Sequence, residues 1–333
     1  MKKISKYLGE YSYIVVFLII LIVYAITNNG LTVSGFMNVF RHSAVIGIIA
    51  FGMGLICLTG DIDLSVGSML ALVSGFTVCI FNITGSIFAT LLFAVIFGGV
   101  CGLINGVLVG IIKIPAFIST LATMLIYRSF AQYFCQHFDK DLIGGGSSVY
   151  RMSNTFDSYQ VMYNFGNGKV LTVPMVGIIL VLMTALFVYL STSTKFGKKI
   201  YAVGSNAKAA GMTGINVDIV KVLVFVIAGL LVGLASFIWI AMNASSDPAT
   251  TGHSYEMYAI AAVVLGGISM SGGRGKVLGI LFGAMSYTVI DKIIVALKMD
   301  SLINDAVKGI ILILVIMIQI VGPQLKARIG SKK

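Results

Sequence analysis

The side chains with the clearest capacity for chemistry lie in one polar run, 59–68, which interrupts an apolar stretch near the N-terminus. The run holds two carboxylates, Asp61 and Asp63, together with glycines and hydroxyl side chains. Ionisable groups inside a membrane are costly, and where they occur they commonly bind a cation or carry a proton. The same order also suits the start of a helix, because Asp63 can accept hydrogen bonds from free N–H groups and interact with the helix dipole. In both interpretations the run lies among or between membrane helices.

Composition places most of the chain in a lipid bilayer. Hydrophobic residues make up 58% of the sequence and charged residues 11%, with a mean hydropathy of +1.01. Typical soluble domains have about 25% charged residues. The apolar runs are continuous rather than alternating, which argues against an outer-membrane barrel. The sequence therefore predicts an all-α polytopic membrane protein, whose 38 glycines suit closely packed helices.

A membrane helix needs about 20 mainly apolar residues, and the polar breaks divide the sequence into about ten such runs. The expected spans are 11–28, 41–59, 64–83, 87–112, 115–135, 171–191, 219–242, 257–271, 276–297 and 303–321. One transmembrane domain then covers residues 1–333, with the membrane bundle at about 11–321. Its two long connections are an external loop, 136–170, and a cytoplasmic loop, 192–218.

The net charge of +11 could indicate a nucleic-acid partner, but the placement of the basic residues argues otherwise. With a cytoplasmic N-terminus and alternating spans, 15 of the 23 lysines and arginines fall inside and five outside, while three fall in or near spans. This bias satisfies the positive-inside rule. The charge thus indicates cytoplasmic N- and C-termini and no nucleic-acid binding.

A faint internal repeat relates the two halves. In each half a span is followed by a polar break, 59–68 or 243–256, and then by a span whose glycines recur every fourth residue. This spacing places them on one helix face, where it permits close helix crossing. The helix-packing glycines are Gly98, Gly102, Gly106 and Gly110, then Gly275, Gly279 and Gly283. Because the halves start from opposite sides of the membrane, the pattern is that of an inverted-topology repeat, with chance similarity among glycine-rich helices as the alternative.

Enzyme signatures are not found in the sequence. The stretch 271–277 resembles a phosphate-binding loop but lacks the upstream glycine, and Val277 replaces the residue that would hold magnesium. We expect no catalytic residue, metal site or cofactor, and therefore not an enzyme. An ion-coupled secondary transporter that uses Asp61, Asp63 or Asp291 remains an alternative. Arg128, near the outer end of its span, is expected to extend to the membrane surface.

The cytoplasmic loop contains the pattern of a short exposed helix. Asn206 can cap it, the Ala-Lys-Ala-Ala stretch favours it, and a following glycine can end it. Such a helix suits the docking of a soluble partner, although an ordinary basic connecting loop explains the same residues.

Four ordered motifs resemble one family. The run 59–68 resembles the "T-x-G-I-D-L-S-V-G-S" segment of ribose/xylose/arabinose/galactoside-type ABC transporter permeases, with Asp61 in place of a small residue. Residues 115–124 resemble the family's "P-(A/S)-F-I-x-T-L-G-T-M", and 204–215 resemble its "G-x-N-x-x-A-A-x-x-(S/T)-G-I" loop. Residues 255–267 resemble "Y-E-L-D-A-I-A-A-x-V-x-G-G" with Tyr258 in place of the acid, and Ser271-Gly272-Gly273-Arg274-Gly275 completes the match over about 35–320.

The resemblance implies the permease subunit of a binding-protein-dependent sugar importer in the bacterial cytoplasmic (inner) membrane. It implies an ABC ATPase that hydrolyses ATP below the membrane, an extracytoplasmic sugar-binding protein, and a second permease subunit of the same or a related chain. The ATPase-coupling residues by this resemblance are Gly204, Asn206, Ala209, Ala210 and Gly214. The motif residues with structural roles are Gly60, Asp63, Ser65, Gly67, Pro115, Glu256, Gly266, Gly267, Gly272 and Gly273.

Overall fold

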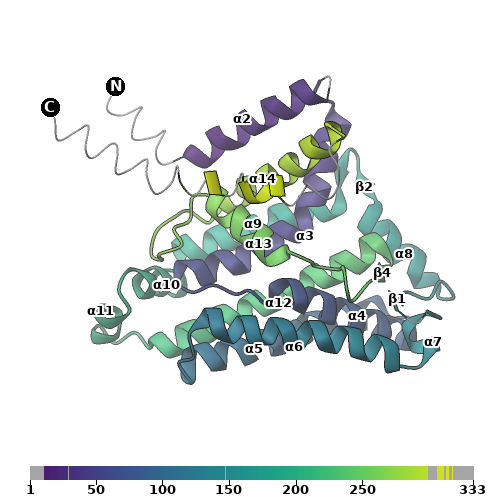
Figure 1. Ribbon diagram of the computed structural model, residues 1–333, viewed down its shortest axis with the longest axis horizontal. Helices are drawn as coiled ribbons and strands as arrows, with labels where there is room; N and C mark the ends of the chain where they lie inside the picture. The colour runs from purple at the N-terminus through teal and green to yellow at the C-terminus, as the bar shows by residue number, and fades with distance from the viewer. Residues whose placement is uncertain are drawn as a thin grey trace.

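The computed structural model describes residues 11–28, 30–146, 148–298, 306–310, 313–314 and 317, and these form a helical bundle (Figure 1). The mainly apolar helices are α2 (Ser12–Thr27), α3 (Val33–Leu58), α4 (Val66–Thr84), α5 (Ile87–Gly106), α6 (Ala116–His137), α9 (Met175–Ser193), α12 (Val217–Asn243), α13 (Tyr255–Leu265) and α14 (Leu278–Ala296). The shorter helical elements are η1 (Val107–Ile111), which is a π-helix, α7 (Lys140–Ile143), α8 (Asp157–Asn167), α10 (Lys195–Ser205) and α11 (Ala207–Met212). The strands are β1 (Tyr150–Arg151), β2 (Lys169–Val170), β3 (Val173–Pro174) and β4 (Ser245–Ser246), which pair antiparallel as β1 with β4 and β2 with β3.

The expectation of an all-α membrane protein is confirmed. Within the described residues, six helical segments are long and apolar enough to cross a membrane: α3, α4, α5 with η1, α9, α12 and α14. Helices α2 and α13 are apolar but shorter, and α6 has 22 residues without reaching the same hydropathy. More than half of the expected span 303–321 lies outside the described residues.

Three helices differ from their expected bounds for local reasons. Helix α3 starts at Val33 rather than at 41, because the Thr32 hydroxyl accepts a hydrogen bond from the Gly35 N–H and caps the helix there. Helix α9 starts at Met175, because the residues before it form the β2–β3 hairpin. Helix α13 ends at Leu265 rather than at 271, and Gly267 beyond it has a φ of +81°.

Helices α3 and α12 form the centre of the bundle. The part of α3 from Ser43 to Leu58 is continuously buried. Helix α12 packs against α5 through glycines on both helices, and a Cβ added at Gly98 would lie 2.8 Å from Gly233 Cα. At Gly102 it would lie 2.9 Å from Gly229 Cα. The glycines that recur every fourth residue in α5 therefore lie on the face that packs against α12.

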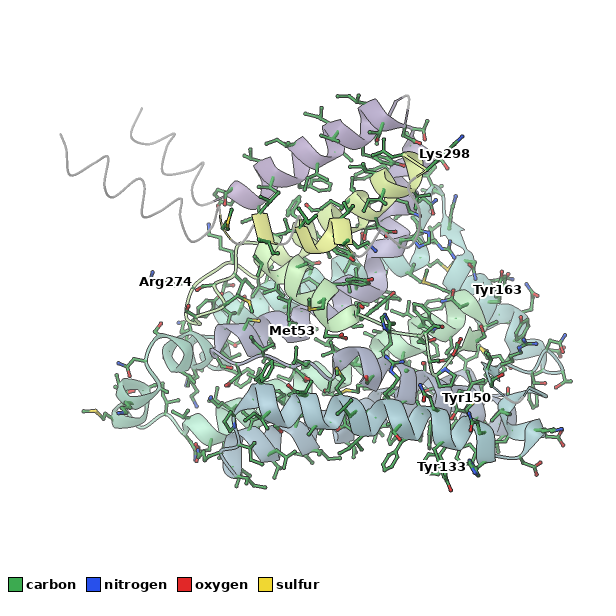
Figure 2. The ribbon with its side chains drawn as sticks, viewed as in Figure 1. Met53, Tyr133, Tyr150, Tyr163, Arg274 and Lys298 are labelled. Carbon is green, nitrogen blue, oxygen red and sulfur yellow. The ribbon has the colours of Figure 1, made fainter. Side chains whose placement is uncertain are left out.

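The connections between helices gather at two opposite ends of the bundle. Segments α10 and α11 lie at one end, and α7, α8, β1 and β4 lie at the other (Figure 1). Figure 2 shows Arg274 at the first end and Tyr150 and Tyr163 at the second. The connections that the charge pattern assigns to the cytoplasm thus lie together, and those that it assigns to the outside also lie together.

Candidate functional site

The first polar break, the extended segment between α3 and α4, is buried in the bundle. The Asp63 side chain is 1% exposed, and its Oδ1 accepts hydrogen bonds from the Ser65 N–H at 2.8 Å and from the Ser65 hydroxyl at 2.6 Å. The Asn105 amide of α5 donates to Ser65 Oγ at 2.8 Å, and the Leu64 N–H donates to Thr120 Oγ1 of α6 at 3.1 Å. The sequence predicts that Asp63 accepts hydrogen bonds from free N–H groups in the first turn of α4. In the structure Asp63 instead bonds to Ser65 and fixes the turn ahead of α4. The break enters the bundle, as the sequence predicts.

The second carboxylate of the run, Asp61, has a different environment. Lys221 of α12 forms an ion pair with Asp61 at 2.8 Å, and the two side chains are 23% and 13% exposed respectively. Asp61 replaces a small residue of the family motif, and this lysine supplies a physical reason for an acid there. Asp291 of α14 is likewise paired, with Lys308 at 2.8 Å.

The second polar break, between α12 and α13, is an irregular segment that starts at Ala244 in the left-handed region and runs mostly through turns. Ser245 and Ser246 form β4 and pair with β1 in the connection between α6 and α9. Deeper in the bundle, Arg128 of α6 donates from Nη1 to the carbonyl oxygens of Pro248 at 2.9 Å and Thr251 at 2.7 Å. The expectation that Arg128 extends to the membrane surface is therefore wrong, since its guanidinium holds this segment.

The two breaks meet inside the bundle at the first turn of α4. A Cβ added at Gly67 would overlap the Gly252 carbonyl oxygen and would lie 2.6 Å from Glu256 Oε2. Ser65, the N-cap residue of α4, makes no side-chain cap hydrogen bond, and Glu256 lies in the first turn of α13. The N-terminal ends of two interrupted helices thus converge on one half-buried carboxylate, where the positive ends of both helix dipoles favour negative charge. We call Gly67, Gly252, Glu256 and Arg128 the polar junction.

The predicted coupling residues lie at the end of the bundle that carries α10 and α11. Asn206 caps α11, because its Oδ1 accepts from the Ala209 N–H at 3.0 Å, as the sequence predicts. Ala209 is exposed, whereas Ala210 is buried against the neighbouring helices, and Gly214 follows α11 with a φ of +85°. Gly204, near the end of α10, lies against Leu58 at the end of α3.

The remaining motif residues lie at the ends of helices. Pro115 is the N-cap residue of α6, and Gly60 follows α3 with a φ of +86°. Gly266 packs against Gly279 of α14, and Gly283 packs against Ala262. Gly275 does not belong to this glycine face, because it lies in the loop before α14 with a φ of +127°. The expectation that Gly275 takes part in helix packing with Gly279 is therefore wrong.

Three residues of this region were missed or misread in the sequence. Asn105 lies in an apolar run, and Lys221 belongs to the basic residues that indicate the topology. The position of Arg128 near the end of its span indicates only a charge that reaches the membrane surface. A lone polar residue inside a predicted span is the signal that could have found Asn105 and Arg128. No group of three metal-binding side chains occurs among the described residues.

Apolar spanning helices, two buried polar breaks and interrupted helices define the class as a multi-pass membrane permease. The chain belongs to the family described as branched-chain amino acid transport system / permease component, whose model matches residues 35–316.

Relatives are similar over nearly the whole chain. The ribose import permease protein RbsC of Bacillus subtilis is 36% identical over 96% of this chain and 92% of its own length. RbsC of Escherichia coli K12 is 33% identical over 92% of both. The autoinducer 2 import system permease protein LsrC of Yersinia pseudotuberculosis serotype O:3 is 31% identical over 86% of this chain and 78% of its own length. No solved structure matches the chain.

Proposed function

We propose that this chain is the membrane permease subunit of an ATP-driven importer that moves a monosaccharide or a related small polyol. The observation that carries the proposal is the similarity to ribose import permeases over more than nine-tenths of both chains. Ribose is therefore the first substrate to test. The similarity to an autoinducer 2 permease extends the substrate class to other small polyhydroxylated molecules.

The proposed assembly has three kinds of component. A cytoplasmic ABC ATPase hydrolyses ATP, an extracytoplasmic binding protein delivers the sugar, and two permease chains, identical or related, form the path. Each permease is a single transmembrane domain over 1–333 in the bacterial inner membrane, with about ten spans and both termini in the cytoplasm. The six long apolar helices and the gathering of the basic connections at one end support this topology.

The polar junction is the proposed constriction of the sugar path. Irregular backbone at membrane depth is tolerated only where protein buries it or water lines it, and the two breaks provide such backbone. The differential binding of the loaded binding protein and of ATP to outward- and inward-facing states supplies the driving force.

Ion coupling has less support than ATP coupling. Asp61 and Asp291 each pair with a lysine, and Asp63 is engaged by Ser65. A carboxylate that pairs with a fixed lysine is already neutralised, so it has little need of a transported cation.

Reconstitution tests the proposal. The permease, the ATPase and the binding protein encoded with it are placed in proteoliposomes and supplied with radiolabelled ribose or a panel of pentoses and hexoses. We expect uptake that requires both ATP and binding protein. Uptake driven by a pH gradient without ATP would support the secondary transporter instead.

Docking of the ATPase on α11 is tested separately. Replacement of the exposed Ala209 by glutamate adds bulk and negative charge to this helix and should reduce both ATPase pull-down and uptake. Normal pull-down and uptake in this variant would contradict the docking assignment. Lys140→Glu, on α7 at the opposite end of the bundle, is the control for added negative charge.

A further inference from the structure

The two helices of the predicted coupling segment differ in how firmly they are held. Helix α11 is loosely attached, since Met212 is 88% exposed and a Cβ added at Gly211 or Gly214 would meet nothing within 4 Å. Helix α10 is embedded, with Ile200 and Val203 buried. The Tyr201 hydroxyl donates to the Gly275 carbonyl oxygen at 2.9 Å, and burial raises the pKa of this phenol, so that it remains a donor.

At the end of α10 three backbones touch with no side chain between them. A Cβ added at Gly204 would overlap the Leu58 carbonyl oxygen and would lie 2.6 Å from the Gly273 nitrogen. The Gly273 N–H donates to the same Leu58 oxygen at 3.0 Å. A Cβ added at Gly272 would lie 2.8 Å from the Gly204 oxygen and 3.1 Å from the Gly60 nitrogen. We call Gly204, Leu58, Gly60, Gly272 and Gly273 the glycine contact.

The glycine contact lies directly at the start of the first polar break. Leu58 is the last residue of α3, and Gly60 is the first glycine of the break that leads through Asp63 to α4. Only six residues separate Gly60 from Gly67, which belongs to the polar junction. Close-packed backbone without intervening flexible side chains transmits displacement rather than absorbing it.

We infer that the glycine contact is the connection through which a displacement of α10 and α11 reaches the polar junction, and that Gly204 is its positioning residue. The inference rests on the proposed function, because it assumes that the ATPase moves α11. In this arrangement α11 provides the docking surface and α10 carries the movement. A shift of α10 moves the end of α3 and the start of the break together, which changes the position of Gly67 against Gly252.

The test compares two glycines of the same segment. Both Gly204 and Gly211 are helical, and alanine is the better helix former at either position, so helix propensity alone predicts a gain for both variants. Gly204→Ala crowds the contact, whereas Gly211→Ala points into open space. Each variant is assembled with the ATPase in nanodiscs or proteoliposomes. We measure ATPase pull-down, ATP hydrolysis with and without ribose-loaded binding protein, and ribose uptake.

We expect Gly204→Ala to retain ATPase binding and basal hydrolysis while uptake and the stimulation by loaded binding protein fall about tenfold. Gly211→Ala should match the parent in every assay. A Gly204→Ala variant with parental uptake and stimulation would overturn the inference. Loss of ATPase binding in proportion to uptake would also overturn it, because the contact would then act in docking.

A milder variant keeps the test decisive if Gly204→Ala does not assemble. Tyr201→Phe removes only the hydroxyl that joins α10 to Gly275, and Tyr189→Phe on α9, at a side chain that is 63% exposed, is its control. We expect Tyr201→Phe to lower uptake per ATP hydrolysed about twofold and Tyr189→Phe to leave it unchanged. An unchanged ratio in Tyr201→Phe would overturn the inference. Failure of the parent itself to show ATP-dependent uptake would instead contradict the proposed function.

Discussion

The two polar breaks are both partly buried, but they are held in different ways. The first break is fixed by side chains that lie close together in its own half, because Asp63, Ser65, Asn105 and Thr120 bond to one another or to its backbone. The second break is longer, and its turns are closed by the side chains of Asp247 and Thr251. Its deep part is joined to α6 through two backbone carbonyls by Arg128. A hydrogen-bond network with several members persists when one of its bonds breaks. A segment that is joined to its neighbour by one side chain separates when that side chain moves.

This difference indicates which break moves during transport. The first break adjoins the glycine contact and follows α3, so it is suited to receive movement. The second break is joined through β4 to β1, in the connection between α6 and α9, and to α6 through Arg128. We expect the second break to be the part that opens, with Gly67 and Gly252 as the place where the two separate.

The largest effect should follow from Gly67→Ala, which prevents the two breaks from meeting. Its Cβ would overlap the Gly252 carbonyl oxygen, and backbone cannot move aside as a flexible side chain can. Overpacking of a tight interior costs about 1–3 kcal/mol or more. We expect uptake to be abolished and the thermal unfolding midpoint to fall, whereas Gly211→Ala should change neither. Parental uptake in Gly67→Ala would show that the closed junction is not needed.

Arg128→Met should have the next largest effect, since it releases the second break alone. The carbonyls of Pro248 and Thr251 lose a charged donor, and each such hydrogen bond contributes about 1.5–3 kcal/mol. We expect hydrogen exchange to rise in 244–254 but not in 60–65, with uptake reduced at least about tenfold. The control is Arg151→Met, at an exposed arginine on β1. Equal rises in hydrogen exchange in the two breaks would contradict the expectation that Arg128 stabilises the second break alone.

Asp63→Asn should weaken the first break by a smaller amount. An asparagine oxygen can still accept from Ser65, but its amide hydrogens would face the amide of Asn105, now 3.5 Å from Asp63 Oδ2. The loss of one buried partner costs about 1–2 kcal/mol. Faster hydrogen exchange should be confined to 60–65. An increase in hydrogen exchange confined to 244–254 would show that Asp63 stabilises the second break rather than the first.

The smallest effect should come from the pair Asp61 and Lys221. Both side chains retain some contact with solvent, so the pair contributes about 1 kcal/mol after screening. Asp61→Asn and Lys221→Met should each lower the thermal unfolding midpoint, and the double variant should lose less than the sum of the two. Additive losses would show that the two charges do not interact.

Hydropathy and charge predicted much of the fold, because a bilayer imposes length and sign rules on each helix separately. The short helix α11 was likewise predicted from Asn206, whose cap depends only on residues nearby in the sequence. The start of α3 was not predicted because the first turns of this helix contain serine, glycine and asparagine, which are not typical of an apolar span. The helix nevertheless begins there, because Thr32 caps it.

The contacts between distant segments could not be predicted. Gly67 with Gly252, and Gly204 with Leu58, depend on how helices pack, and a single sequence carries no record of such pairing. The glycine spacing of α5 indicated a packing face but not that Gly229 and Gly233 of α12 would meet it. Continuing the same spacing to Gly275 failed, because periodicity cannot show that a residue lies outside the helix.

The shortness of α13 has a consequence for selectivity. Eleven residues rise about 16 Å, which is about half of a hydrocarbon core, so the irregular chain at 244–254 must supply much of the remaining depth. Backbone outside a helix presents peptide groups, which are the same for every residue type. A solute that passes such a surface is sorted by its size and by the number of hydrogen bonds that it can exchange. One permease backbone can then transport several sugars, and selectivity among them is determined by the protein that delivers the sugar.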